Sequence, residues 1–249
     1  MEGQFHAVWR VRGVRLMVLS RRLMSAAGQG LVQYSASLDG VGTPGDHFLS
    51  DNAGVAAAYT LSAFVKFSDT SVRRGIMGWL NAAGYNQEAN ALERNSDNQL
   101  RWLGVGGVEN TGLSISDTNW HHVHVTRSSG QISITLDAGT PYAVSNDNLP
   151  TTPSSRYLAF GRLGEFVTHI FSGNMAHCWY VDGASYGVST FASGGLPKAP
   201  SVIDAAISSY GSNGGALLFG NSGDLSAVSY GGGSFTAYGD PTQSTEFPT

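Results

Sequence analysis

The sequence has little cysteine, little charge and no long apolar run. Cys178 is the single cysteine, so no intrachain disulfide can form and the fold must be held by its packed core. Charged residues make up 13% of the chain, about half of the usual share, so the polar surface must come from Ser, Thr, Asn, Gln and Gly. The apolar run at residues 16–19 is shorter than a signal-peptide core, and no stretch approaches the ~20 residues of a membrane-spanning helix. These absences exclude a disulfide scaffold and predict no membrane span.

Charge is unevenly distributed along the chain. Residues 1–23 contain five arginines and one glutamate, a formal charge of +4, and because the whole chain carries −4, residues 24–249 carry −8. An acidic body argues against nucleic acid as the main partner, since phosphate binding needs concentrated Lys and Arg. We expect residues 1–30 to be a basic arm or leader with little fixed structure, because Met24 followed by SAAGQG looks like a natural start. An arm that docks on a membrane or an assembly partner is the alternative.

Residues 120–139, WHHVHVTRSSGQISITLDAG, predict a β-hairpin, because two alternating segments are joined by a short Ser-Ser-Gly turn. In the first segment Trp120, His122 and His124 fall on one face. His121 falls on the other face together with two valines. The second segment alternates isoleucine and leucine with serine and threonine. Both segments are therefore predicted to be strands whose two faces lie in different environments.

From residue 31 onward the chain reads as short strands separated by turn signals at intervals of roughly eight to twelve residues, which is typical of a sandwich or barrel. The expected strands include residues 32–38, 48–49, 60–67, 74–79, 91–94, 100–103, 157–161 and 175–181. One helix is expected at residues 201–208, with Gly211 just beyond it as a stop signal. Its shared apolar face comprises Val202, Ile203, Ala206 and Ile207.

Several motifs in order resemble the laminin-G-like domains, which are concanavalin A-like jelly-roll sandwiches. They are LDGVGTPGDHFLS at 38–50, YTLSAFVKF at 59–67, the WHHVHV hairpin and YVDG at 180–183, and the resemblance covers residues 34–190. It implies an all-β, antiparallel jelly-roll β-sandwich of the concanavalin A-like lectin and glucanase fold, with one short helix near 201–208. We expect a sandwich over residues 31–192, followed by a helix and a Gly/Ser-rich tail over 193–249 that returns to the sandwich.

The tail resembles the segment that follows such domains in tail and virion proteins of tailed bacteriophages. The matching residues are YGSNG at 210–214, Phe235, Thr236, Gly239 and TQST at 242–245. Where the family usually has a D-x-S-G-N turn, this chain has SAVS at 226–229, so a metal role of that turn does not carry over. The resemblance implies a phage particle protein, made in the host bacterial cytoplasm and located in the virion.

Calcium is the metal that the resemblance favours, since related sandwiches hold it at a loop edge through Asp and Asn oxygens. The candidates by residue type are Asp46, Asp51, Asn52, Asn146, Asp147 and Asn148. Each is also an ordinary turn residue, which is the favoured explanation, so the prediction is that the protein needs no cofactor and calcium is the alternative. His122 and His124 could hold zinc with a third ligand, whereas the resemblance implies strand-surface or hydrogen-bonded imidazoles without metal.

A sugar ligand would be held by exposed rings and amides, because sugars stack on aromatic faces and form hydrogen bonds with Asn and Gln. The segment NAAGYNQ at 81–87 has this mixture. The candidate ligand-binding residues are Tyr85, Asn86, Gln87, Trp102 and Asn110. The alternative for each is packing or assembly, and Trp79 and Trp120 are expected in the core.

No catalytic residue is predicted. The GxGxxG match at 40–45 lacks a following helix, and the GxSxG match around Ser185 lacks a strand-to-helix turn. The E-x-D-x-x-E run of related glucanases is absent, and Glu88 and Glu93 would face opposite sides of a continuous strand.

We therefore predict a non-enzymatic virion protein, in the tail, a fibre or the capsid decoration, that is homo-oligomeric or present in many copies. Its predicted partners are other virion proteins or host-surface glycan. A free carbohydrate-binding lectin or adhesin is the alternative, and a glycan hydrolase is the third possibility.

Overall fold

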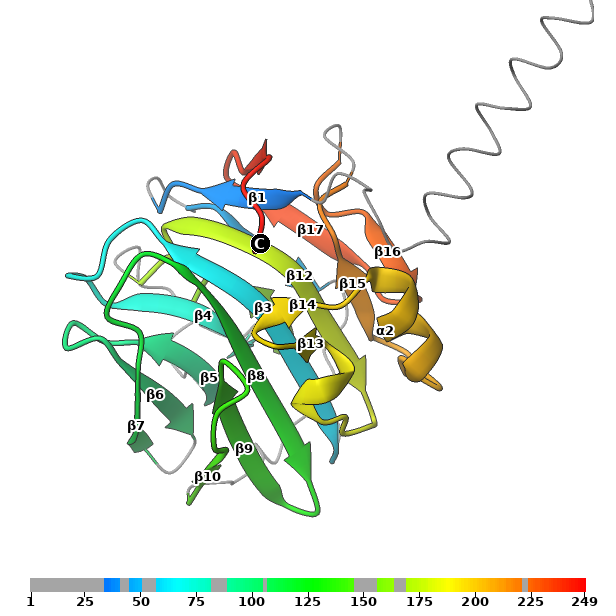
Figure 1. Cartoon of the computed structure of the whole chain (residues 1–249), viewed down its shortest axis with the longest axis horizontal. Coiled ribbons are helices and arrows are strands. Elements are labelled where there is room, and N and C mark those ends of the chain that lie inside the picture. The colour runs from blue at the N-terminus through cyan, green and yellow to red at the C-terminus, as the bar shows by residue number, and fades with distance from the viewer. Residues whose placement is uncertain are drawn as a thin grey trace, which may run out of the picture. The chain divides into compact units, whose positions relative to one another are not determined.

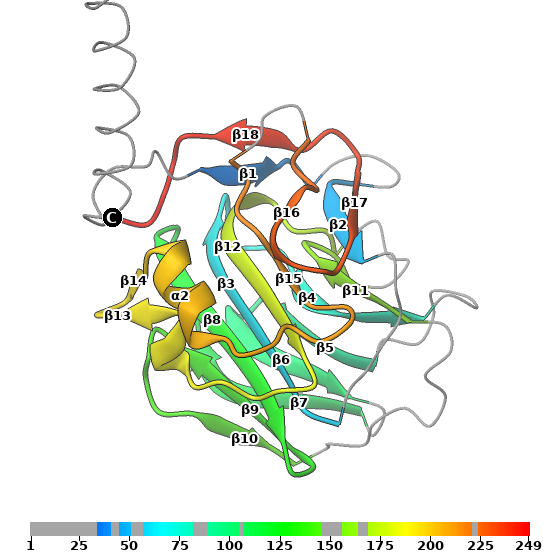
Figure 2. The same ribbon diagram turned by 90° about the vertical axis from the view of Figure 1, so that its right-hand side faces the viewer.

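Two antiparallel β-sheets stack face to face in the structure, a computed structural model of the chain (Figure 1 and Figure 2). It describes residues 34–40, 45–50, 57–81, 89–104, 107–145, 156–163, 169–220 and 224–249. Within these residues one sheet has nine strands and the other seven, and we call them sheet A and sheet B. The predicted fold class, an all-β antiparallel sandwich with one short helix, is confirmed.

Sheet A brings together strands from both ends of the described chain. Its order is β10-β9-β8-β3-β12-β1-β18, and β15 pairs with both β12 and β16. Its strands are β1 (Ser35–Leu38), β3 (Tyr59–Phe67), β8 (Trp120–Ser128), β9 (Gln131–Leu136), β10 (Tyr142–Val144), β12 (Gly173–Asp182), β15 (Gly215–Leu217), β16 (Val228–Gly231) and β18 (Thr242–Ser244).

Sheet B packs against it and has the order β17-β2-β11-β4-β5-β6-β7. Its strands are β2 (His47–Ser50), β4 (Arg74–Asn81), β5 (Ala89–Arg94), β6 (Gln99–Gly104), β7 (Gly107–Ser114), β11 (Arg156–Phe160) and β17 (Phe235–Tyr238). The tail thus adds β17 to sheet B and β15, β16 and β18 to sheet A.

The main core lies between the two sheets. Aromatic rings fill much of it, and the ring centroids of Tyr59 and Trp79 lie 4.5 Å apart. Burying one large apolar side chain stabilises a fold by about 1.5–3 kcal/mol, so this core replaces the covalent links that the sequence lacks. Cys178 is itself part of the core, and its burial raises the pKa of its thiol.

The predicted hairpin is confirmed as β8 and β9. Ser128 pairs with Gln131, so Ser129 and Gly130 alone form the turn, both with positive φ (52° and 79°). A two-residue turn with positive φ at both positions matches the twist of the two strands. The inward residues Val123 and Val125 of β8 lie in the main core.

An irregularity in β12 changes the alternation of its side chains. Ala176 pairs with Phe64 and Trp179 with Ser62, so one extra residue is inserted in β12. His177 adopts a φ of 48°, a left-handed conformation seen at such bulges. As a result Cys178 enters the core, whereas His177 and Trp179 both contact aromatic rings on the outer face of sheet A.

A third layer covers this outer face (Figure 2). It comprises residues 184–210, with a 3-10 turn (Val188–Thr190), β13 (Ala192–Ser193), β14 (Leu196–Pro197) and α2 (Pro200–Ala206), together with residues 245–249. We call these two segments the cover. Phe191 and Ile203 pack on Trp179 of β12, and Phe247 packs near Phe64 of β3.

The predicted helix is confirmed as α2, but its predicted apolar face is only half correct. Ile203 and Ile207 are buried, whereas Val202 is 52% exposed and Ala206 is also exposed. A helix of seven residues lying on a sheet contacts it along one narrow line, and Ile203 and Ile207, four positions apart, occupy that line. Among the described residues the helices are too short to reach across a bilayer.

Candidate functional site

Four arginines gather near the start of β4, the end of β5 and the start of β6, three neighbouring strands of sheet B. Arg73 and Arg74 stand at the start of β4, and Arg94 closes β5, where Glu93 precedes it. Successive residues of a strand point to opposite faces, so these charged side chains divide between the two sides of sheet B. We call Arg73, Arg74, Arg94 and Arg101, with Asp69 and Glu93, the arginine rim.

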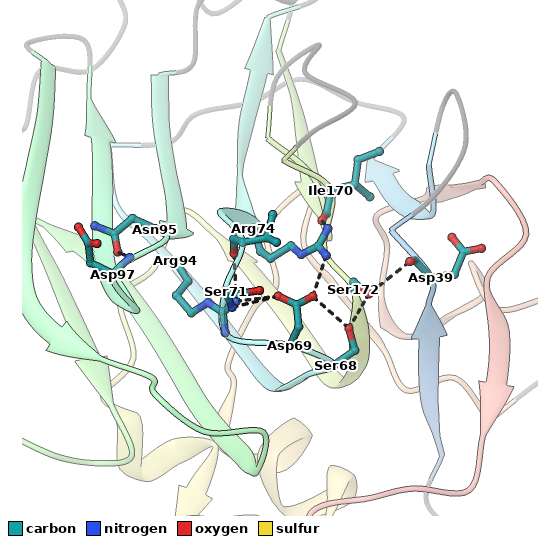
Figure 3. Close-up of polar contacts among 11 residues, drawn as sticks. Asp39, Ser68, Asp69, Ser71, Arg74, Arg94, Asn95, Asp97, Ile170 and Ser172 are labelled. Atoms are coloured by element: carbon teal, nitrogen blue, oxygen red, sulfur yellow. Dashed lines mark hydrogen bonds and ion pairs between the residues drawn. The ribbon is translucent and has the colours of Figure 1, made fainter.

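On the inner side Asp69 lies between two guanidinium groups (Figure 3). Arg74 Nη2 donates to Asp69 Oδ2 at 2.7 Å, and Arg94 Nη2 lies 3.7 Å from Asp69 Oδ1. Arg94 is fully buried, donates to the Val72 carbonyl at 3.0 Å and stacks 4.1 Å from the ring centroid of Phe67. Burial raises the pKa of Asp69, but the hydrogen bond and charge of Arg74 outweigh it, so the net pKa is lowered.

A second carboxylate, Glu93, is held on the outer side. Its side chain has no exposed surface, and it accepts hydrogen bonds from Arg73 Nε and from Arg101 Nε at 2.7 Å and Nη2. The arginine side chains keep 28% and 24% of their surface exposed. Burial, together with the charges of these two arginines, lowers the pKa of the nearby His169 to about 4. Among the described residues, the Glu93 carboxylate therefore lies between two guanidinium groups, and the nearby His169 imidazole is neutral at neutral pH.

Next to Arg101 the outer face of sheet B reaches solvent. Arg101 pairs with Asn110 of β7, and Leu103 pairs with Val108. Directly paired residues place their side chains on the same face. Asn110 is exposed and Val108 is 55% exposed, whereas Leu103 is buried. We call Arg101, Val108 and Asn110 the β6–β7 face.

The predicted sugar-binding residues separate in the structure. Asn110 lies on the β6–β7 face, but Trp102 points the other way and is fully buried in the main core. The prediction for Trp102 is therefore wrong, because in β6 the alternation that turns Arg101 outward turns Trp102 inward. Tyr85, Asn86 and Gln87 lie outside the described residues.

Asp46, the calcium candidate that the structure describes, accepts hydrogen bonds from backbone amides. It is buried, and its carboxylate accepts the amide N–H of Asp39 at 3.0 Å and of Asp240 at 2.7 Å. Burial raises the pKa of Asp46, opposed by these two hydrogen bonds. The other candidates, Asp51, Asn52, Asn146, Asp147 and Asn148, lie outside the described residues. Within the part of the chain that is described, no group of three or more His, Cys, Asp or Glu side chains could hold a metal ion.

Two histidines of the hairpin, His122 and His124, lie under the cover. His122 Nε2 lies 2.8 Å from Ser62 Oγ, and His124 Nε2 donates to the Tyr186 carbonyl at 3.0 Å. Both are buried, as is His177, and Nδ1 of each makes no hydrogen bond. Desolvation lowers the pKa of His122 and His177 to about 3 and of His124 to about 4. All three are therefore neutral imidazoles at neutral pH, packed among aromatic rings.

His121 has the opposite character. It is partly buried between two carboxylates, with Nδ1 2.7 Å from Asp137 Oδ2 and Nε2 3.0 Å from Asp117 Oδ1. The hydrogen bond to Asp137 raises its pKa, and burial only partly opposes this. Neighbouring positions of one strand thus carry a histidine that favours its charged form and one that is held neutral.

Sequence reasoning did not identify the arginine rim. The signal that could have revealed it is a local density of charge. All six charged residues of the rim lie between residues 69 and 101, in a chain of which only 13% of the residues are charged. Ion pairing across strands depends on register, and the pairing of Glu93 with Arg101 and of Gly75 with Glu93 becomes known only from the sheet.

Comparisons with known proteins identify the fold. No family model matches the chain, and no curated protein matches it. Among solved structures, a heptameric SAP-like pentraxin from Limulus polyphemus is similar at a TM-score of 0.50 and 15% identity, over 64% of this chain and 80% of that one. The chain has the concanavalin A-like jelly-roll fold. At 15% identity this likeness concerns the fold alone.

Two further solved structures are similar at lower TM-scores. Domain 4 of an extracellular arabinanase from Geobacillus stearothermophilus, in complex with arabinotriose, has a TM-score of 0.44 and 16% identity, over 64% of this chain and 78% of that chain. Domains LG4-5 of the mouse laminin α1 chain have a TM-score of 0.43 and 14% identity, over 59% of this chain and 40% of that chain.

Proposed function

We propose that this concanavalin A-like chain is a non-enzymatic binding protein of a phage particle. Its ligand is a host-surface glycan or another virion subunit, and its binding surface includes the β6–β7 face. The observation that carries the proposal is the contrast between the two outer faces. The cover occupies much of the outer face of sheet A, whereas the β6–β7 face of sheet B presents exposed side chains on a rigid strand pair. Sites on strands are positioned more accurately than sites on loops.

The state of the buried carboxylates supports a binding role over hydrolysis. Glycoside hydrolysis uses two carboxyl groups that flank the scissile bond and reach the substrate. Glu93 has no exposed surface and is engaged by two guanidinium groups, and the Asp46 oxygens accept backbone N–H groups. Neither carboxylate is placed to exchange a proton with a substrate.

A location in the virion is supported by the tail. Its motifs resemble those of tail and virion proteins of tailed phages, and its strands β15, β17 and β18 are integrated into both sheets. We propose that the chain is made in the bacterial cytoplasm and assembled into the particle in many copies. Repeated copies would convert weak individual contacts into strong attachment.

Mass spectrometry of purified particles tests the location, with a constant copy number per particle as the expected result. Absence of the chain from particles that carry its coding frame would overturn the virion assignment. A glycan array probed with the purified chain tests the binding role, and retention on at least one glycan, without shortening of that glycan, is expected. Cleavage of a retained glycan would overturn the non-enzymatic assignment.

A further inference from the structure

We propose that residues 245–249 act as a strap that acid releases: when His177 beneath the strap takes up a proton, the strap leaves sheet A while the two sheets stay folded. Such a conformational device is independent of the proposed glycan and virion roles. Its support comes from the surroundings of His177, the few contacts that hold the strap and the firmer attachment of the rest of the cover.

His177 lies where the structure accommodates only a neutral imidazole. It is 2% exposed, and its Nδ1 atom makes no hydrogen bond. Aromatic rings surround it, and the ring centroids of Phe247, Trp179 and Phe64 lie 5.1, 6.3 and 6.4 Å from its own. The titratable group that faces it is His122 of β8, which is also neutral at neutral pH. A proton on His177 would therefore place an unhydrated charge among rings, with no counter-charge from the described residues.

The strap has few attachments to sheet A. Phe247 packs on the rings of the sheet and Pro248 is buried, whereas the other three residues of the strap are exposed. Residues 246–249 make no backbone–backbone hydrogen bond to the rest of the described chain. The charged groups at the strap are Glu246 and Lys66 of β3, and their ion pair is exposed, so it adds little. A segment held in this way opens at a low cost in free energy.

The rest of the cover, residues 184–210, is attached more firmly. The Tyr186 amide donates to Thr60 Oγ1 at 2.8 Å, and the Tyr186 carbonyl accepts His124 Nε2 at 3.0 Å. A buried apolar cluster that includes Ile203 adds to these hydrogen bonds. Local opening follows the weakest attachment, so we expect acid to release the strap before this segment.

The pH range of release follows from the direction of the pKa shift. With the strap closed, burial lowers the pKa of His177 to about 3. Release exposes the ring and returns its pKa toward 6.5, so the open form binds the proton more tightly. The ratio of open to closed strap then rises about tenfold for each pH unit below 6.5, until the closed-state pKa is reached. Between pH 7.5 and 4.5 the ratio should rise about a hundredfold.

A thiol in the strap measures its opening in the full chain. Pro248→Cys places this thiol at the buried position of the strap, and the native Cys178 reports opening of the core in the same molecule. Both thiols are labelled with a pyridyl disulfide reagent and are distinguished by mass spectrometry of their peptides. Dividing each rate by that of the unfolded chain at the same pH gives an opening constant. We expect the constant of the strap to rise about a hundredfold between pH 7.5 and 4.5, and to exceed that of Cys178 throughout.

Three further variants, made together with Pro248→Cys, test what controls the release. His177→Asn, which suits the φ of 48° at this position, is expected to reduce the rise to less than about threefold. His124→Asn is the matched control, because it removes a buried histidine that lies under residues 184–210, and the hundredfold rise should remain. Glu246→Gln should open the strap slightly at pH 7.5 and leave the rise intact.

A second measurement does not depend on the folding of a His177 variant. Phe247→Ala removes the ring that closes over His177, and NMR titration of the imidazole is expected to show its pKa raised toward 6.5 relative to the unmodified chain. An unchanged pKa would overturn the role of the strap in burying His177.

The thiol measurements decide between local release and the other effects of acid. A rise in the strap alone that His177→Asn removes and His124→Asn retains supports the proposal. Equal opening constants at the strap and at Cys178 would mean that acid unfolds the whole sandwich, and would overturn it. A rise that survives His177→Asn but disappears in Glu246→Gln would assign the release to the ion pair with Lys66, and would overturn the role of His177. A constant opening of the strap from pH 7.5 to 4.5 would also overturn the proposal.

Discussion

The outer faces of the two sheets bury polar groups in different ways. On sheet A, His122, His124 and His177 are neutral and lie beneath the cover, with Nδ1 atoms that make no hydrogen bond. On sheet B, Glu93 is equally buried but lies between two partly exposed guanidinium groups. A neutral imidazole tolerates an apolar cover, whereas a buried carboxylate needs opposite charges beside it. The covered face therefore contributes stability, and the charged face retains groups that can meet a ligand.

The largest effect is expected from acid, which should lower the free energy of unfolding by destabilising sheet A. The three histidines have folded pKa values of about 3 to 4, below the value of 6.5 for the exposed group. Their contribution is complete above pH 6.5 and is lost as pH falls toward 4, by about 2 kcal/mol for each histidine at pH 5. Urea unfolding between pH 7.5 and 4.5 measures this loss.

A pair of variants tests whether the buried histidines cause the loss of stability in acid. His177→Asn, which suits the positive φ at this position, removes one titrating group and is expected to make the stability less dependent on pH. His121→Asn is the control at a partly buried histidine whose pKa is shifted upward, so its contribution is present below pH 6.5 and is lost as pH rises through the folded pKa. An unchanged pH profile for His177→Asn would contradict the account of sheet A.

The next largest effect on stability is expected from Glu93, on the outer face of sheet B. Glu93→Gln removes the carboxylate that Arg73 and Arg101 both contact and is expected to lower the free energy of unfolding by about 3 kcal/mol, because the two guanidinium groups lose the buried anion that they share. Chemical unfolding at pH 7 measures it. A change below 1 kcal/mol would show that the two arginines do not depend on this carboxylate.

The cover is tested by a pair of neighbouring substitutions. Ile203→Ala removes a fully buried side chain from α2 and is expected to destabilise the protein by about 2 kcal/mol. Val202→Ala, at the adjacent exposed position, is the control and is expected to change stability by less than about 0.5 kcal/mol. Equal effects in thermal unfolding would mean that α2 does not pack on sheet A as described.

The smallest effect is expected from the ion pair of Lys66 with Glu246. Its atoms are 2.8 Å apart, but the side chains are 31% and 53% exposed. Exposed pairs contribute about 0–1 kcal/mol and are screened by salt, so Glu246→Gln should have little effect on unfolding at 0.15 M salt or above. A loss comparable to that of Glu93→Gln would show that the C-terminal segment depends on this pair.

The sequence by itself determined many of the strands, the hairpin and the helix, but it did not predict β7 (Gly107–Ser114) or β10 (Tyr142–Val144). Period-two alternation at residues 120–139 placed Val123 and Val125 of β8 on the face opposite to His122 and His124, and the turn residues set the hairpin. These features are local, since each depends on residues that are close together in the chain.

The tertiary structure alone decided which faces are covered and which charges meet. Alternation does not say what packs against a face, so the burial of His177 beneath Phe247, and the inward position of Trp102, became clear only from the packed sheets. The arginine rim likewise joins three strands through their register, and a shift of one residue would turn Arg101 into the core and Trp102 to solvent. Burial and ion pairing are properties of neighbours in space, which local sequence patterns do not specify.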